Sequence, residues 1–451
     1  MENSRSSHYR ALLRLGLPIV AGQLGIMAFS IADTIMVGQH SQLELSAVGL
    51  TNQIFNMAIV ACIGFSYGLT PLVGALFGQG KSGDIGRLLR NAILANLVIA
   101  VFFSALLFVF YLNIHRMGQP EELIPVARPY FLTLLYSLFP LMIFNAFRQC
   151  VEGIQDTRTC MWILLVGNAV HIVSNYAFIY GFWIIPEMGL TGAGISTLLT
   201  RVGMCIFFVY WFFCRPRYAP FREGFRLACL NRVDFKRLNA LGWPIATQMF
   251  LETASFSFCA VMIGWMGATA LATNQIIYAV SGVFFMMYIG MGAAITVRIS
   301  YFRGQGDLEA ARRSALCGFH LIMFIALGCI LLVWLCKDFI APLFTDDPEI
   351  ARGIPVLLLP LFLYQFSDGL QIAFASALRG LSDVKILISY SFVCYLVISL
   401  PISYLFAFVF DWGLAGIWYS FTVSLTIAGV LYYLRFMRQL KHRIVPPSKA
   451  S

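Results

Sequence analysis

The sequence predicts an all-α integral membrane protein whose twelve transmembrane helices form two six-helix lobes related by a parallel repeat. Three observations predict this fold: the composition, the length of the apolar runs and an internal duplication. Of the 451 residues, 59% are hydrophobic and only 12% are charged, whereas about 25% are charged in soluble domains. The mean hydropathy of +0.79 points the same way. A soluble globular protein is therefore not expected.

Twelve apolar runs are each about 20 residues or longer, enough for a helix to cross roughly 30 Å of hydrocarbon. They lie near 14–37, 49–77, 91–113, 129–149, 160–183, 191–214, 240–264, 270–297, 314–336, 355–378, 386–410 and 414–434. The first run follows three arginines, as a signal peptide would. It is too long for a signal-peptide core and lacks a small-x-small cleavage site, so we expect an uncleaved helix.

The placement of lysine and arginine predicts the orientation of these helices. With both termini in the cytoplasm, 26 of the 31 Lys and Arg residues fall at inner ends and inner loops. Outer loops hold four, and Arg201 lies inside the 191–214 run. This asymmetry follows the positive-inside rule and explains the net charge of +10 without nucleic acid as a partner. We expect a multi-pass plasma (inner) membrane protein with both termini cytoplasmic, and a basic 215–237 stretch against anionic lipid headgroups.

The chain also contains a duplication at a spacing of 222 to 227 residues. The repeated motifs are GLPI at 16–19 and GWPI at 242–245, TNQI at 51–54 and 273–276, and GQG at 78–80 and 304–306. Six helices per copy is an even number, so both copies enter the membrane from the same side, as in parallel-repeat transporters. The predicted domains are an N-terminal lobe at 1–214, a basic cytoplasmic linker at 215–239, and a C-terminal lobe with a basic tail at 240–451.

Three carboxylates interrupt the apolar runs: Asp33, Glu252 and Asp368. An ionisable group at the bilayer centre costs at least ~2.5 kcal/mol unless it faces a partner or a wet cavity, so we interpret all three as parts of an ion or substrate pathway. None has an acidic equivalent in the other copy. Glu252 and Asp368 lie at a similar depth near mid-membrane, which predicts a shared site, while Asp33 lies closer to the outer mouth.

Tyr364 and Asp368 are four residues apart, so a helix presents them on one face. With Glu252 they would form an anionic site made only of oxygen ligands. Such a site suits a hard cation such as sodium, and it equally suits a proton shared between two acids. The structural alternative for Tyr364 is ordinary aromatic packing with its hydroxyl against Asp368.

These motifs resemble those of the multidrug and toxic compound extrusion family, in its NorM-type branch, over nearly the whole chain. The residues that carry the resemblance are Leu17-Pro18-Ile19, the segment Ala32 to Gly38, Gly78-Gln79-Gly80, Leu251-Glu252, Tyr364 to Asp368, and Ala377 to Gly380. The resemblance implies a secondary active exporter of cationic, amphipathic compounds, driven by inward sodium or protons.

The resemblance also implies roles for particular residues. Glu252, Tyr364 and Asp368 would form the coupling-cation site and hold sodium if sodium is the ion. Asp33 would belong to the first-lobe cavity, where it is linked to protonation or drug binding. Pro18 corresponds to a proline associated with bending of the first helix.

His171 and Asn175, also four residues apart, depart from the family pattern of two asparagines or an asparagine and an aspartate. The functional hypothesis makes His171 a titratable partner of Asp33, because histidine switches charge near neutral pH. The structural alternative is an interior histidine bonded to a backbone carbonyl. A titrating His171 would favour protons over sodium. We interpret Arg201 as a structural partner of Asp33 or a side chain that snorkels to a polar vestibule.

Several other functions are weighed against export. Residues 75–82 fit a relaxed phosphate-loop pattern, but they end an apolar run and no segment is long enough for a nucleotide domain, so no ATP is expected. Glu252 and Asp368 lack any hydrolase motif, so we expect no enzyme. A lipid-linked oligosaccharide or lipid flippase of the same superfamily stays open. The expected partners are cationic drugs or dyes and membrane lipids, with a monomeric chain and no cofactor beyond the coupling ion.

Overall fold

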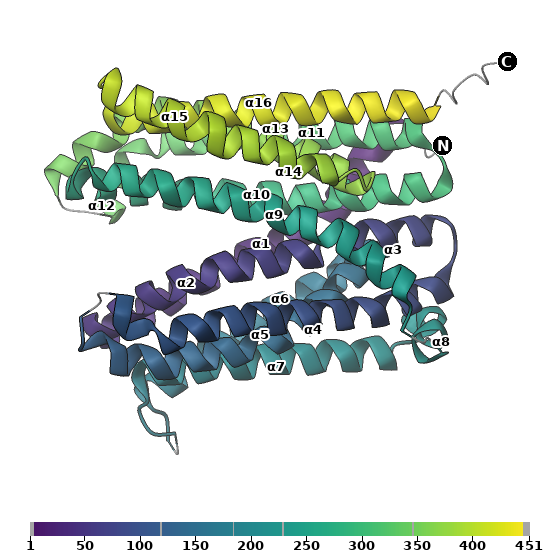
Figure 1. The fold of residues 1–451 in the computed structure, drawn as a ribbon, viewed down its shortest axis with the longest axis horizontal. Coiled ribbons are helices and arrows are strands. Elements are labelled where there is room, and N and C mark those ends of the chain that lie inside the picture. The colour runs from purple at the N-terminus through teal and green to yellow at the C-terminus, as the bar shows by residue number, and fades with distance from the viewer. Residues whose placement is uncertain (1–3, 118–119, 184, 228–229, 345–346, 445–451) are drawn as a thin grey trace. The chain divides into compact units, whose positions relative to one another are not determined.

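The computed structural model describes residues 4–117, 120–183, 185–227, 230–344 and 347–444. Within these ranges the secondary structure is helical, and the only β-type pairing is a single bridge between Phe182 and Ile185. Twelve helical spans are long and apolar enough to cross a membrane. The predicted all-α class and the number of spanning helices are confirmed (Figure 1).

The helices follow the predicted runs in order. The first six spans are α1 (Arg5–His40), α2 (Gln42–Ser66) continued by α3 (Leu69–Gly78), α4 (Ser82–Leu112), α5 (Leu123–Gly153), α6 (Thr157–Tyr180) and α7 (Gly189–Cys214). The second six are α9 (Arg232–Gly264), α10 (Ala268–Gln305), α11 (Leu308–Leu335), α13 (Pro348–Gly380), the 385–409 span and α16 (Gly413–Ile444). Short helices α8 (Ala219–Leu227) and α12 (Lys337–Phe344) lie between spans.

Several helices extend beyond the apolar runs that predict them, because helical hydrogen bonding does not depend on the hydrocarbon boundary. α9 begins at Arg232 rather than near 240, and α10 ends at Gln305 rather than near 297. Gly306 stops α10 in a left-handed conformation (φ +80°), as is common after a helix C-terminus. Asp307 then caps α11 by accepting a hydrogen bond from the Ala310 backbone N–H at 2.8 Å.

The chain divides into two compact units. The N unit contains residues 21–246, and the C unit contains residues 1–20 and 247–451. Both boundaries fall inside helices, within α1 and within α9. Pro18 and its repeat counterpart Pro244 lie two residues before these boundaries. A proline in a helix interior removes one backbone hydrogen bond, so both helices have a weakened turn where the unit changes. The division into lobes at the 215–239 linker stays a prediction from the repeat.

The N unit is built around α5, which packs against α2, α4 and α7, while α6 packs against α7 (Figure 1). Two clusters of buried apolar side chains fill it, one including Phe65, Leu88 and Phe147, the other including Phe55, Phe131 and Leu190. The basic linker is partly folded: α8 packs on α4 so closely that a side chain at Gly86 would clash with the Phe221 carbonyl. The mixture of apolar and basic residues in the linker sequence did not predict this short helix.

The C unit is built around α13, which packs against α10, α11 and α16. The 385–409 span is irregular, because α14 (Lys385–Ser391) and α15 (Ser399–Tyr404) are each followed by a π-helical segment, Phe392–Ile398 and Leu405–Val409. Such segments are rare and often occur at functional sites. The first one carries Tyr395, which reaches the acidic site described below.

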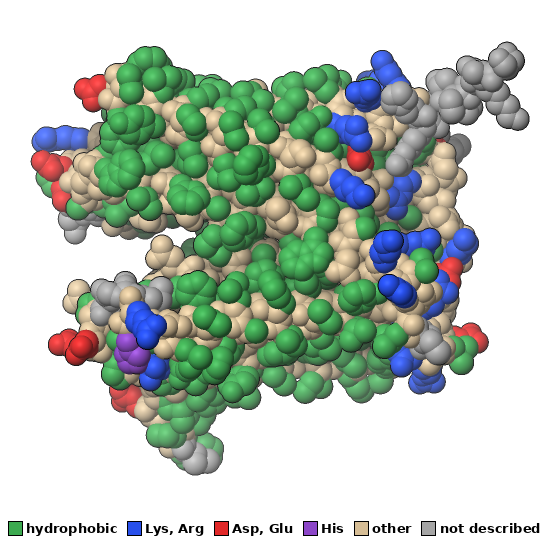
Figure 2. All heavy atoms as spheres, in the orientation of Figure 1, with side chains coloured by type: hydrophobic (Ala, Val, Ile, Leu, Met, Phe, Trp, Pro, Cys, Tyr) green, Lys and Arg blue, Asp and Glu red, His purple; other side chains and the backbone are tan. Residues whose placement is uncertain are grey.

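The surface of each unit, taken by itself, has a broad apolar band (Figure 2). Blue Lys and Arg side chains gather at one end of each unit: the end with α8 in the N unit, and the end where α16 finishes in the C unit. Few appear at the opposite ends. This is the surface expected of membrane-spanning units with one basic face.

Candidate functional site

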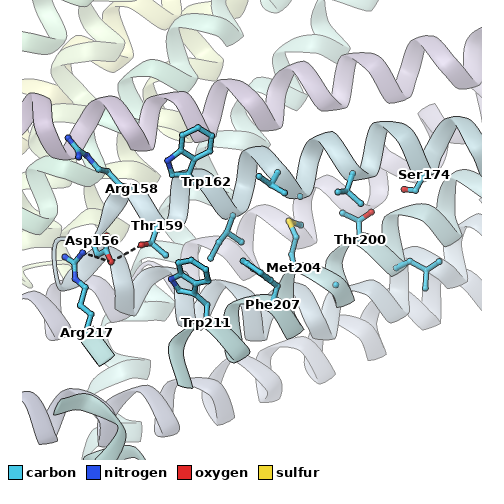
Figure 3. Close-up of a pocket in the computed structure, with 16 residues that line it drawn as sticks. Asp156, Arg158, Thr159, Trp162, Ser174, Thr200, Met204, Phe207, Trp211 and Arg217 are labelled. Carbon is cyan, nitrogen blue, oxygen red and sulfur yellow. Dashed lines mark hydrogen bonds and ion pairs between the residues drawn. The ribbon is translucent and has the colours of Figure 1, made fainter. Parts of the chain in front are cut away.

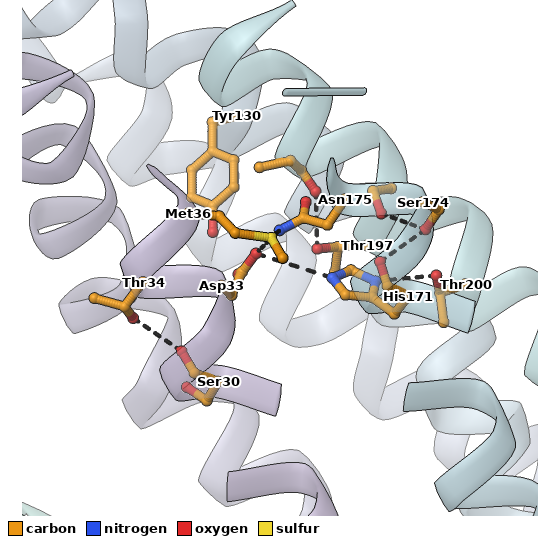
Figure 4. A network of polar contacts seen from close by, with 12 residues as sticks. Ser30, Asp33, Thr34, Met36, Tyr130, His171, Ser174, Asn175, Thr197 and Thr200 are labelled. Carbon is orange, nitrogen blue, oxygen red and sulfur yellow. Dashed lines mark hydrogen bonds and ion pairs between the residues drawn. The ribbon is translucent and has the colours of Figure 1, made fainter. Parts of the chain in front are cut away.

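In the N unit, Asp33 of α1 meets the polar face of α6 (Figure 4). Asn175 Nδ2 donates a hydrogen bond to Asp33 Oδ1, and His171 Nε2 lies 3.9 Å from the same oxygen. His171 and Asn175 are one helical turn apart, so α6 turns both toward α1. The Asp33 side chain keeps 17% of its surface exposed, whereas His171 and Asn175 are buried. The structure thus brings together the three residues that the sequence predicts for the first-lobe site.

His171 is held by one ring nitrogen and open at the other. Its Nδ1 lies 3.0 Å from the Thr200 hydroxyl of α7, and its ring packs edge-on against Phe29 at a centroid distance of 4.1 Å. Its Nε2 is buried and has no hydrogen-bond partner among the described residues. The structural alternative anticipated a backbone carbonyl; a hydroxyl takes that place. The unpartnered nitrogen faces Asp33 at a distance slightly too long for a direct hydrogen bond.

Neighbouring contacts fix the position of Asp33. The Tyr180 hydroxyl donates to the Met36 carbonyl at 2.8 Å, one turn beyond Asp33. At the end of α1, His40 bridges Glu44 at 2.7 Å and Glu187 at 2.9 Å. The C-terminal half of α1 is therefore tied to α2, α6 and the segment before α7. Sequence reasoning did not identify this clamp, because Glu44 and Glu187 lie at helix ends where acids are common.

Arg201 does not form an ion pair with Asp33 within the described part of the chain. Its guanidinium donates to the Ser137 hydroxyl of α5 at 2.7 Å and interacts with Asp33 and Tyr130 only at longer range. Arg201 therefore adds positive potential around the site without neutralising Asp33 by contact. Tyr130 lies beside the site and donates to Asn52 at 3.4 Å (Figure 4).

In the C unit, Asp368 of α13 is the most unusual group. It is 1% exposed, and neither of its carboxylate oxygens has a hydrogen-bond partner among the described residues. A buried polar group without a partner is costly, and an ionised one far more so. By contrast, the buried Glu152 of the N unit pairs with Arg148 at 2.7 Å. Within the described residues, the charge of Asp368 is therefore not compensated by a hydrogen bond.

Glu252 of α9 lies close enough to Asp368 for their charges to interact. It is supported by a relay of donors. Arg379 donates to Gln248 Oε1 at 2.6 Å, and Gln248 Nε2 donates to Glu252 at 3.3 Å. The two acids are therefore unequal, because Glu252 has a donor and Asp368 has none among the described residues. Gln248 and Arg379 were missed from the sequence, although Gln248 is one turn before Glu252.

Two glutamines extend the acceptor face of α13 around Asp368. Gln365 Nε2 donates to Ser281 at 3.2 Å, and Gln371 Nε2 donates to the Tyr395 hydroxyl at 2.7 Å. The carbonyl oxygens of both side-chain amides are buried and without partners among the described residues. Their spacing of three residues on either side of Asp368 was a readable signal that sequence reasoning passed over.

The aromatic packing expected of Tyr364 is present, whereas its role as a cation ligand stays a prediction and its hydroxyl does not bond Asp368. Its ring packs against Trp418 at a centroid distance of 5.1 Å and against Phe421 at 6.3 Å. It lies one turn before Asp368 and interacts electrostatically with Asp368 and Glu252. The structure therefore places Glu252, Tyr364 and Asp368 in one neighbourhood.

No cluster of three or more His, Cys, Asp or Glu side chains suited to a metal occurs in the described ranges. A transition-metal site is not indicated there. Buried carboxylate and amide oxygens instead suit a hard monovalent cation or protons. Sodium would depend on the two carboxylates with the Tyr364 phenol, and on the amide oxygens of α13.

The start of α1, which includes Pro18, is tightly packed in the C unit. A side chain at Gly16 would meet Met291 of α10 at 2.8 Å, and one at Gly290 would meet Val20 at 2.7 Å. His8 adds a hydrogen bond to Ser314 at 2.8 Å. The predicted bending residue therefore follows a firmly anchored helical segment, and its role in gating stays a prediction.

Comparison with known families identifies the chain. The MatE family model matches residues 18–177 and 244–405, two stretches that begin 226 residues apart like the sequence repeats. The chain belongs to the MatE family. The predicted family resemblance is confirmed, and with it the interpretation of the chain as a multi-pass membrane protein.

Relatives within the MatE family extend over almost the whole chain. It is 29% identical over 440 residues to the multidrug resistance protein NorM of Photobacterium profundum, and 30% identical over 438 residues to the multidrug resistance protein MdtK of Yersinia pseudotuberculosis. Each alignment covers 94% of both chains. Both relatives are named as multidrug resistance proteins.

Solved structures of MatE proteins share the fold. One is an outward-facing multidrug resistance MATE family transporter of the MOP superfamily, with a TM-score of 0.89, 20% identity and 97% of each chain covered. Another is a mutant of the Vibrio cholerae MATE transporter VcmN, with a TM-score of 0.85, 19% identity, and 97% and 98% of the chains covered. MatE membership establishes the fold and family; the roles of individual residues stay predictions.

Proposed function

We propose that this MatE protein is a secondary active antiporter that exports cationic amphipathic compounds in exchange for inward sodium or protons. The observation that carries the proposal is Asp368, a fully buried carboxylate with no hydrogen-bond donor in the described structure. A structural role does not explain the free-energy cost of burying the Asp368 carboxylate, so we infer that this residue acts in transport. Glu252 beside it makes the site a place where a cation or a proton binds favourably.

Coupling follows from a difference in affinity between conformations. Two ionised acids repel each other, and Asp368 has no donor in the described structure, so the empty pair favours whichever arrangement hydrates or separates the two carboxylates. A bound cation or proton removes that repulsion and favours the arrangement in which the pair is buried. A ligand shifts such an equilibrium only by its difference in affinity between the two states. Rocking of the two lobes is the motion that we propose connects these states.

The proposed cargo follows from the N unit and from the named relatives. Asp33 keeps part of its surface exposed, so its charge is available to a cationic compound in a way that buried Asp368 is not. Proton uptake by Asp33 or its partner His171 would release the compound. The relatives named multidrug resistance proteins support export of small molecules by this chain.

The proposed setting is the plasma membrane with both termini in the cytoplasm. The support is the basic end of each unit, which collects the inner loops and the chain termini (Figure 2). The proposed energy source is the ion gradient across that membrane.

The test is dye efflux from proteoliposomes, with sodium and proton gradients imposed separately. One of the two gradients should drive export of a cationic dye such as ethidium, and collapsing it should stop export. Asp368→Asn should abolish the gradient response, while Glu309→Gln, an exposed acid on α11, should leave it intact. Efflux that ignores both gradients, or movement of labelled lipid-linked sugar in place of dye, would refute the proposal and favour a flippase.

A further inference from the structure

A groove of about 620 Å³ runs between α6 and α7 of the N unit, apart from the Asp33 site (Figure 3). Arg158 and Arg217 lie at one end, beside Trp162 and Trp211. Ser174 and Thr200 lie at the other end. The middle is lined by apolar side chains. The groove adjoins the Asp33 site at Thr200, whose hydroxyl bonds His171, but neither Asp33 nor His171 lines it.

One wall of the groove is a regular stripe on α6. Arg158, Trp162, Val166, Val170 and Ser174 follow one another at four-residue intervals, so they form one ridge of the helix. Trp162, Val166 and Val170 are each more than half exposed. From 158 to 174 the ridge is about 24 Å long at 1.5 Å per residue. That is longer than half of the roughly 30 Å hydrocarbon core, so the groove can hold one extended acyl chain.

The other wall is a stripe on α7. Leu199, Gly203, Phe207 and Trp211 follow at the same four-residue interval. A side chain at Gly203 would meet nothing within 4 Å, so this glycine leaves open space in the wall. Two aromatic side chains beside this open space suit a flexible hydrocarbon chain.

The charged residues at the end of the groove with Trp162 and Trp211 suit an anionic headgroup. Asp156 is buried, and its carboxylate accepts from Thr159 at 3.0 Å, from the Tyr218 hydroxyl at 2.7 Å and from Arg217 at 3.2 Å. Burial raises the pKa of Tyr218, so its phenol stays a proton donor to Asp156. Three donors therefore consume the only negative charge among the described residues that line the groove.

Arg158 is left as an exposed guanidinium without an ion pair or hydrogen bond to any described residue. Arg217 adds a second guanidinium that is 63% exposed although it touches Asp156. The end of the groove is therefore net positive, at the level where Trp162 and Trp211 would mark a membrane interface.

We propose that this groove is a binding site for an anionic phospholipid, with the phosphate at Arg158 and Arg217 and one acyl chain between α6 and α7. The chain would end beside Thr200, the residue that holds His171, so occupancy adjoins the N-unit acid site. The proposal goes beyond the transport function and does not depend on it.

The experiment measures quenching of tryptophan fluorescence by brominated lipids in the purified full-length protein. The signal is the fluorescence of Trp162, taken as the part of the emission that is lost in the Trp162→Phe variant. Brominated phosphatidylglycerol should quench it at lower mole fraction than brominated phosphatidylcholine. Arg158→Gln should reduce this preference about fivefold, the effect of one arginine near an anionic lipid surface. Arg226→Gln, an exposed arginine on α8 outside the groove, is the matched control and should leave it unchanged.

A second variant tests the acyl chain without changing charge. Gly203→Leu fills the open space, so it should weaken quenching by both lipids, while Gly203→Ala should not. Thermal unfolding of each variant confirms that it is folded. Equal quenching by the two lipids in the wild type, equal losses in Arg226→Gln, or no effect of Gly203→Leu would overturn the proposal. So would displacement of the phosphatidylglycerol by ethidium or by glycerol phosphate, which would assign the groove to the drug or to free phosphate.

Discussion

The two acidic sites differ in how their charges are satisfied. In the N unit, Asp33 receives a hydrogen bond from Asn175, faces His171 at 3.9 Å and is partly exposed. In the C unit, Asp368 is fully buried and both of its oxygens lack partners in the described structure. A hydrogen-bonded, partly exposed carboxylate suits a large cationic ligand that binds and dissociates. An unsatisfied, buried one suits an ion small enough to enter the protein interior.

The comparison is tested most severely by neutralising the C-unit acids. Asp368→Asn and Glu252→Gln should each abolish gradient-driven efflux. Asp368→Asn should leave the protein as stable as wild type or more so, because it removes a buried carboxylate with no hydrogen-bond donor in the described structure. The measurement is dye efflux together with the melting temperature. Unchanged cation dependence in both variants, or a marked fall in the melting temperature of Asp368→Asn, would contradict the assignment.

Neutralising the N-unit acid should cost drug binding rather than ion coupling. Asp33→Asn keeps the shape of the side chain but removes the acid of the N-unit site, and no repeat-equivalent acid replaces it. We expect affinity for a cationic dye to fall by about tenfold or more, since a charge-assisted contact contributes about 1.5–3 kcal/mol. Fluorescence polarisation of the dye with purified protein measures this. Unimpaired binding would move the drug site elsewhere.

A smaller effect is expected when the N-unit site loses its titratable neighbour. His171→Asn should retain export but flatten the pH dependence of dye binding between about pH 5 and 8, the range in which histidine changes charge. A protonated His171 would neutralise Asp33 and weaken its attraction for a cation, so wild-type affinity should fall as the pH falls through this range. Dye titrations across that range compare the two proteins. Identical profiles would return His171 to a purely structural role.

The smallest expected effect concerns the group that orients His171. Thr200→Val removes the hydroxyl bonded to Nδ1 at 3.0 Å and keeps the size of the side chain. Losing one such hydrogen bond costs about 1 kcal/mol, roughly fivefold in an equilibrium constant. The pH profile of dye binding should therefore change as in His171→Asn, toward a flatter profile, but by less. The control is Ser196→Ala: Ser196 lies one turn before Thr200 on α7 and bonds Ser174. A change of equal size in the pH profile of this control would show that the effect comes from general packing.

Residues of one helix account for most of what was predicted about the sites. Tyr364 with Asp368, and His171 with Asn175, share helical faces because of their four-residue spacing, and the structure places both pairs as expected. Several supporting partners were not predicted: Thr200 of α7 beside His171, and the relay from Arg379 of α13 through Gln248 to Glu252. Gln365 and Gln371 lay within reach of the same spacing argument and were overlooked.

The sequence by itself determined the class, the twelve spans, the repeat and the three unusual acids. Each of these depends on local properties: the length of an apolar run against a bilayer of known thickness, or a charge inside such a run. Only the tertiary structure decided which acid is satisfied, how the linker folds into α8, and that α1 and α9 each divide between two compact units. The physical reason is rotation. Each residue turns a helix by about 100°, so contacts between helices depend on how distant segments pack, which no run length records.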